Sequence, residues 1–102
     1  MSLDIRYSPL AVREMNEIAD YLAQQSPRLG LRFLKAVEDT CTQLADMPEM
    51  ASRYESENPR LADLRVWAVH GFPNHLVFFR IKQSYLEIVE VLYGGRDLEK
   101  LL

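Results

Sequence analysis

The charged side chains best placed for chemistry lie in the last third of the chain. Arg65 and Arg80 each stand inside a run of β-forming residues, and Arg96 follows a pair of glycines after the last run. Guanidinium groups bind phosphate and carboxylate oxygens through paired hydrogen bonds, so an anion-binding surface is expected here. A structural alternative is that Glu87 or Glu90 pairs with the first two arginines on the solvent side of a sheet. Surface ion pairs of that kind contribute less than about 1 kcal/mol.

Other residue types that carry chemistry are sparse. Cys41 is the single cysteine, which excludes an internal disulfide, and its place in a helical apolar stripe favours a buried thiol over a reactive one. His70 and His75 flank a Gly/Pro turn without a nearby cysteine, so a turn role is predicted for them rather than zinc binding. Gly94-Gly95 lacks the GK[ST] signature of a phosphate-binding loop. The sequence therefore predicts no metal and no cofactor.

Charge and hydropathy restrict the partners of the protein. The formal net charge is −3, so the molecule as a whole repels phosphate backbones and direct DNA binding is not expected. The chain contains no apolar run of membrane-spanning length and no basic start followed by an apolar signal region. A lone cysteine fits a reducing compartment. These features predict a cytoplasmic protein without membrane contact.

One short strand and two helices are expected in the first half of the chain. Leu3–Tyr7 alternates apolar and polar residues, which is typical of a strand. Ser8-Pro9 and Ser26-Pro27 are helix start signals, because serine caps the first turn and proline lacks only an N–H that is unpaired there. Helices are therefore predicted from Pro9 to about Gln25 and from the second signal to Met47. A tight turn joins them into an α-hairpin.

Three β-rich runs dominate the second half and predict an antiparallel meander: Leu64–Val69, His75–Ile81 and Tyr85–Tyr93. The polar segment Glu49–Asp63 predicts a surface connection, and the Gly/Pro cluster at 70–74 predicts a turn. Asp97 is placed to cap a short C-terminal helix. The predicted fold class is α+β, a single domain over residues 1–102 in the order β-α-α-β-β-β. Its helical hairpin packs on a small, mainly antiparallel sheet.

This layout and several motifs together resemble the RelE/ParE superfamily, and the similarity covers nearly the whole chain. The motifs are the Met47-Pro48 helix end, Leu64-Arg65-Val66, the run Phe72–Arg80 and, last, Ile88–Leu98. Members of this superfamily are the toxins of bacterial type II toxin–antitoxin systems, also labelled plasmid stabilisation proteins. The resemblance is placed in the ParE-like subfamily. It implies a growth-arresting toxin on the fold just described.

The superfamily contains two activities, poisoning of DNA gyrase and ribosome-dependent mRNA cleavage. A metal-free ribonuclease needs a base, several cations and an acid, and Arg65, Arg80, Tyr93 and Arg96 are the candidates for such catalytic roles. However, Leu98 occupies the region where RelE-like nucleases tend to carry a tyrosine, and the acidic total suits ribosomal RNA poorly. The sequence therefore favours a ParE-like gyrase inhibitor. A RelE-like endoribonuclease and an inactive binding module are the alternatives.

The resemblance also implies a protein partner, a cognate antitoxin that wraps the α-hairpin and the sheet. Tyr21 and Leu31 fall on the flanks of the two helical apolar stripes, so we predict that they border the antitoxin groove. Packing at the edge of the core is the alternative for both. Contact with the target is predicted for the C-terminal residues Arg96, Leu98, Leu101 and Leu102, and docking of the leucines on the domain is their structural alternative.

Overall fold

The computed structural model describes residues 2–94, and these contain two α-helices and five strands. The elements in chain order are β1 (Asp4–Tyr7), α1 (Pro9–Ala23), α2 (Pro27–Asp46), β2 (Ser52–Arg53), β3 (Arg65–Val69), β4 (Phe72–Ile81) and β5 (Tyr85–Tyr93). Short 3₁₀ turns occupy Pro48–Met50 and Pro59–Leu61. The helix predicted after Asp97 lies outside the described residues. None of the described helices is long and apolar enough to cross a membrane.

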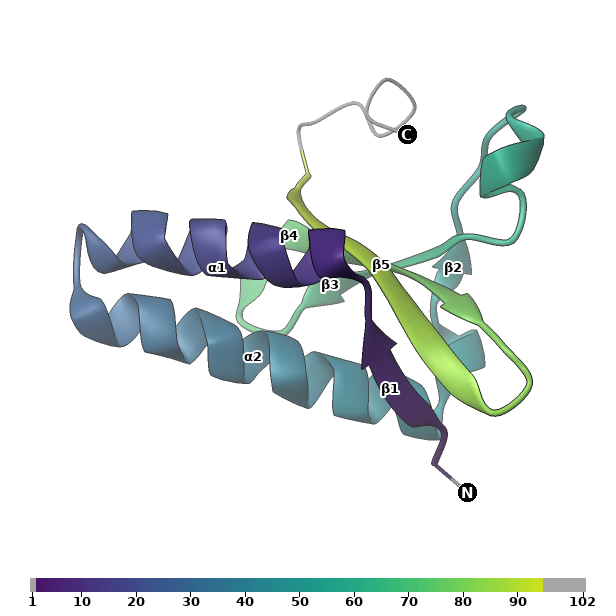
Figure 1. Ribbon diagram of the computed structural model, residues 1–102, viewed down its shortest axis with the longest axis horizontal. Coiled ribbons are helices and arrows are strands. Elements are labelled where there is room, and N and C mark those ends of the chain that lie inside the picture. The colour runs from purple at the N-terminus through teal and green to yellow at the C-terminus, as the bar shows by residue number, and fades with distance from the viewer. Residues whose placement is uncertain (1, 95–102) are drawn as a thin grey trace.

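The strands form one sheet in the order β1-β5-β4-β3-β2. β1 runs parallel to β5, with Tyr7 opposite Ile88, and the other neighbouring strands are antiparallel. Both helices lie against the sheet as a hairpin, and β1 brings the start of the chain beside its last strand (Figure 1). The predicted α+β architecture is confirmed, with one additional short strand, β2.

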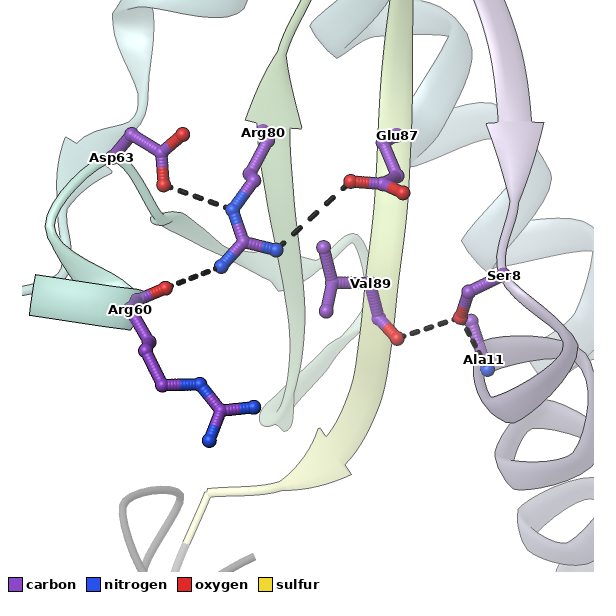
Figure 2. A network of polar contacts seen from close by, with 7 residues as sticks. All are labelled: Ser8, Ala11, Arg60, Asp63, Arg80, Glu87 and Val89. Carbon is purple, nitrogen blue, oxygen red and sulfur yellow. Dashed lines mark hydrogen bonds and ion pairs between the residues drawn. The ribbon is translucent and has the colours of Figure 1, made fainter. Parts of the chain in front are cut away.

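Ser8 fixes the start of α1 to the sheet. Its Oγ accepts a hydrogen bond from the N–H of Ala11 at 2.9 Å and donates one to the carbonyl oxygen of Val89 at 2.8 Å (Figure 2). The first bond is the expected N-cap, and the second ties the helix to β5. α1 ends at Ala23, two residues before the predicted Gln25, because the Gln24 and Gln25 N–H groups bond back in a closing turn.

The main core lies between the helices and one face of the sheet. α2 contributes a fully buried stripe of Phe33, Val37, Cys41 and Leu44. Cys41 is 0% exposed, so the predicted burial of this thiol is confirmed, and burial raises its pKa to about 11. Gly30 lets the helices approach closely, since a Cβ there would lie 2.6 Å from the carbonyl oxygen of Ala19.

A second, smaller apolar cluster covers the opposite face of the sheet, here called the far face. Its buried members are Leu61, Leu64, Phe78 and Leu92, with Tyr54, Val66, Leu76 and Val89 packed around them. The segment predicted as a plain surface connection therefore needs correction. It contains β2 and two 3₁₀ turns, and it buries Leu61 to 1% exposure. The apolar side chains at its end dock on the sheet despite the polar composition around them.

The β3–β4 connection is shorter than predicted. The turn is confined to His70-Gly71, where Gly71 adopts φ 79°, a left-handed conformation that glycine takes without strain. β4 starts at Phe72, and Pro73 is accommodated in it because the register with β3 shifts from Ala68–Leu76 to Val69–Phe72. The predicted five-residue turn was therefore too long.

A β-bulge in β5 changes which side chains face solvent. Phe78 pairs with Glu90 but Phe79 pairs with Ile88, so Val89 and Glu90 both lie opposite Phe78. Strict alternation fails at such an insertion. The bulge thus places Glu90 on the face of Phe78, where it is buried at 2% exposure. Of the two acidic residues expected to meet the arginines, Glu87 is the one that pairs with Arg80 within residues 2–94.

Candidate functional site

Arg80 fastens the 54–64 segment to the far face (Figure 2). Its Nε donates to Asp63 Oδ1 at 2.8 Å, its Nη2 donates to the carbonyl oxygen of Arg60 at 2.6 Å, and its Nη1 lies 3.9 Å from Glu87 Oε1. The hydrogen bond from Arg80 holds the pKa of the Asp63 carboxyl below its usual value. With a side chain only 20% exposed and three partners, Arg80 acts as a brace rather than a free cation.

Arg65 lies on the other face of the sheet. The next residue, Val66, packs in the far-face cluster, so Arg65 points to the opposite, helix-facing side. Its Nη1 donates to the carbonyl oxygen of Ala51 at 2.8 Å. Arg53 stands directly opposite it across β2 and β3. Arg65 and Arg80 therefore lie on opposite faces of the sheet. The ion pair expected between these arginines and Glu87 or Glu90 is present, among the described residues, between Arg80 and Glu87.

Tyr93 sits in an aromatic cluster at the end of β5. Its ring lies 5.5 Å from that of His75, its cross-strand partner, and the His75 ring lies 5.1 Å from that of Phe33 on α2. Partial burial lowers the pKa of His75, so the neutral imidazole is favoured. The neighbours of Tyr93 are thus aromatic, and neither Arg65 nor Arg80 belongs to this cluster.

Two open hollows flank the α-hairpin, each with a volume of about 530 Å³. The first, here the α1 hollow, is lined by Glu17, Ile18, Tyr21, Leu22, His75 and Tyr93. The second, the α2 hollow, lies between the start of α2 and the β3–β4 turn, and Leu31, Ala36 and Phe72 are among its lining residues. The first is walled by apolar and aromatic side chains, whereas charged residues of α2 rim the second.

Tyr21 and Leu31, predicted to border one groove, line different hollows. Tyr21 is 64% exposed in the α1 hollow and Leu31 is 70% exposed in the α2 hollow. Both stand near the tip of the hairpin, where α1 ends and α2 begins. Core-edge packing therefore does not account for either side chain, because both are largely open to solvent.

The predicted target-contacting residues, Arg96, Leu98, Leu101 and Leu102, lie outside the described residues. Sequence reasoning missed the bracing role of Arg80 on Asp63 and the burial of Glu90. Asp63, an acidic residue shortly before β3, gave a weak signal for the contact with Arg80. The placement of Glu90 depends on the bulge in β5, for which the sequence carries no signal that we recognise. Within residues 2–94, two largely apolar hollows thus flank the hairpin, and a further hollow is lined by Arg53, Asp63 and Arg65.

Comparison with solved structures places the fold among toxin–antitoxin proteins. A chain of the chromosomal ParDE toxin–antitoxin system from P. aeruginosa matches with a TM-score of 0.71 and 15% identity, over 88% of this chain and 94% of that one. A chain of the RelBE2 toxin–antitoxin complex from Mycobacterium tuberculosis matches with a TM-score of 0.64 and 17% identity, over 91% and 99%. At such identities these likenesses establish the fold alone.

The family itself follows from the sequence match. Residues 5–98 match the family model described as the ParE toxin of the type II toxin–antitoxin system parDE, and the chain belongs to this family. The predicted membership of the RelE/ParE superfamily is thereby confirmed. No curated protein sequence matches the chain.

Proposed function

We propose that this ParE-family toxin arrests growth by inhibiting DNA gyrase. The observation that carries the proposal is the separation of the nuclease candidates. Arg65 is tied to a carbonyl oxygen on the helix-facing side of the sheet, and Arg80 is tied to Asp63 on the far face. A ribonuclease must gather a base, cations and an acid around one phosphate. That separation, together with the net charge of −3, favours a protein target over RNA.

The test measures which synthesis stops first when the chain is induced in bacteria. Incorporation of labelled thymidine is expected to fall within minutes, before incorporation of labelled methionine. An earlier fall in methionine incorporation would instead support mRNA cleavage, and no fall in either would support an inactive binding module. Purified gyrase should also lose supercoiling activity when the purified toxin is added.

The C-terminal arginine provides a sharper variant of the same test. If Arg96 contacts the target, Arg96→Ala should lose most of the inhibition of supercoiling. Arg28→Ala is the matched control, because it removes an exposed arginine of α2 that lines neither hollow. Undiminished inhibition by a folded Arg96→Ala protein would remove Arg96 from the target contact.

We further propose that a cognate antitoxin neutralises the toxin by covering the hairpin tip. The exposed side chains of Tyr21 and Leu31 stand at this tip in two separate hollows, which suits a partner segment that crosses from one to the other. Each alanine substitution should weaken binding about tenfold, as truncation of an anchoring side chain does. Val12→Ala is the matched control, since Val12 is exposed on α1 but lines neither hollow. Calorimetric titration with unchanged affinity for both variants would contradict this surface.

A further inference from the structure

The α1 hollow brings together aromatic rings from three elements. Tyr21 comes from α1, His75 from β4 and Tyr93 from the end of β5, and the two tyrosines are 64% and 53% exposed. The His75 and Tyr93 rings lie 5.5 Å apart at an interplanar angle of 76°. The faces of aromatic rings carry partial negative charge, and several rings around one open space form the kind of cage that binds cations.

The carboxylate of Glu17 lies on the rim of this hollow. Glu17 precedes Tyr21 by four residues, so both side chains lie on one face of α1. Among the described residues its ion-pair partner is Arg13, whose Nε lies 4.0 Å from Glu17 Oε1, and the two side chains are 69% and 70% exposed. Such an exposed pair is weak. The carboxylate of Glu17 is therefore able to accept hydrogen bonds from a cation that enters the hollow.

The lining residues of the α1 hollow, all within the described chain, supply no fixed positive charge. They include neither lysine nor arginine. Partial burial lowers the pKa of His75, so its ring is neutral at neutral pH and does not repel a cation. Ile18 and Leu22 add apolar surface that continues into the main core. A ligand that fits this hollow carries a positive charge at its tip and apolar groups along its stem.

We propose that the α1 hollow binds an arginine side chain of the antitoxin. The stem of this arginine packs on Ile18 and Leu22, its guanidinium stacks on the tyrosine rings, and Glu17 accepts its hydrogen bonds. Arginine suits the site better than lysine, because a guanidinium is planar and less strongly hydrated. The chain makes one such contact itself, since the guanidinium carbon of Arg6 lies 4.0 Å from the centre of the Tyr85 ring.

Charge also distinguishes the two hollows of the hairpin. α1 carries three acidic residues and one arginine, which favours a basic partner segment beside it. The α2 hollow is lined by Arg32 and Lys35, so it is not expected to take a cation. That the arginine belongs to an antitoxin rests on the proposed function. The affinity of the hollow for an arginine side chain does not depend on the identity of the partner.

NMR titration of the purified, ¹⁵N-labelled full-length chain with capped amino acids tests this affinity. The probe is Nα-acetyl-arginine methylamide, the citrulline analogue removes the charge at nearly the same shape, and the leucine analogue offers an apolar side chain alone. We expect saturable shifts of the Tyr21, Leu22 and Tyr93 amides with the arginine probe, and roughly tenfold weaker binding of the citrulline analogue. The amide of Leu31, in the α2 hollow, should not shift.

Two variants locate the binding in the hollow. Glu17→Gln and Tyr21→Leu should each weaken binding of the arginine probe about three- to tenfold, since one loses the carboxylate and the other an aromatic face. Asp20→Asn is the matched control, the same loss of charge on the same helix at a residue that does not line the hollow, and it should bind like wild type. The amide spectrum of each variant shows whether it is folded.

Several outcomes would overturn the arginine site. They are equal binding of the arginine and citrulline analogues, binding of the leucine analogue as tight as that of arginine, and an affinity that Glu17→Gln and Tyr21→Leu leave unchanged. With the antitoxin itself, Glu17→Gln should weaken binding about tenfold and Asp20→Asn should not, and equal affinities would remove the arginine from that complex. The probe titrations involve neither gyrase nor an antitoxin, so their failure is distinct from failure of the proposed function.

Discussion

His75 illustrates how a single ring connects the core to the α1 hollow. It pairs across the strands with Tyr93, contacts Phe33 of α2 and Phe72 of its own strand, and lines the hollow beside Tyr21. Because partial burial disfavours its charged form, protonation of this side chain opposes folding. The hollow is thus formed around a neutral imidazole.

Partial burial of His75 makes the stability of the domain depend on pH. The pKa of His75 is lowered in the folded state from the ordinary value of 6.5, so the unfolded chain binds more protons at mildly acidic pH. The stability that the neutral ring provides is therefore complete above pH 6.5 and declines as the pH falls from there toward the folded-state pKa. His75→Phe keeps a ring but cannot titrate, so its free energy of unfolding should decline less between pH 7 and 5. Parallel urea curves across that range would test this, and equal slopes for both proteins would contradict it.

At the scale of elements, the two helices begin with the same sequence signal but different bonding. Ser8 makes both a cap bond and a bond to the carbonyl oxygen of Val89, whereas Ser26 caps α2 without a side-chain hydrogen bond in the described structure. Ser8→Ala should lower the free energy of unfolding by about 2 kcal/mol, since it removes a cap and a bond between elements. Ser26→Ala is the matched control and should change it by only a few tenths of a kcal/mol. Similar losses for the two variants, measured by urea unfolding, would show that the bond to β5 contributes little.

The two helices approach each other closely at Gly30. Alanine is the better helix former, yet a Cβ at Gly30 would lie 2.6 Å from the backbone oxygen of Ala19, so Gly30→Ala must push the helices apart. We expect a loss of about 1–3 kcal/mol in the free energy of unfolding, the usual range for overpacking. Thr42→Ala, at an exposed site of the same helix, should be neutral or slightly stabilising. Chemical denaturation distinguishes these outcomes, and a Gly30→Ala protein as stable as wild type would refute the close contact.

These elements also show what the sequence could and could not predict. Both helix starts were predictable because serine followed by proline is a local signal, and the three long strands were predictable from their β-forming residues. The bulges at Val69 and Val89 depend on pairing between strands, which no single strand encodes. Strict alternation places Glu87 and Glu90 on opposite faces of the strand, whereas the second bulge turns Glu90 to the face of Phe78, where it is buried.

At the scale of the whole molecule, one sheet is covered unequally on its two faces. The helices bury the main core, and the far face is covered, within residues 2–94, by the 54–64 segment, held by Arg80 and by a few apolar side chains. The pairing of β1 with β5 joins the two ends of the domain and could not be predicted from local patterns. Regions with few buried contacts open first, so the far-face cover should open before the helix-facing core.

Asp63 makes this difference in stability measurable. Arg80 lowers its folded-state pKa below the ordinary 3.8, so the carboxylate supports the segment above that pH and its support is lost as the pH falls through the lowered value. Asp63→Asn should remove the support at neutral pH. Because the Asp63 side chain is 65% exposed, the expected effect is small, a roughly two- to fivefold loss of hydrogen-exchange protection for the segment.

The informative amides are those whose bonds close the segment. The Tyr54 N–H bonds to the carbonyl oxygen of Leu64 at 2.7 Å and should lose protection in Asp63→Asn, whereas the Ser8 N–H, bonded to Ile88 at 2.9 Å, should not. Asp39→Asn makes the same change in an ion pair on α2 and should leave both amides unaffected. Loss of protection at both amides in Asp63→Asn would mean that the segment and the core open together. Loss at Tyr54 alone would establish the far-face cover as a separate unit, the part of the domain that a binding partner can displace without unfolding the rest.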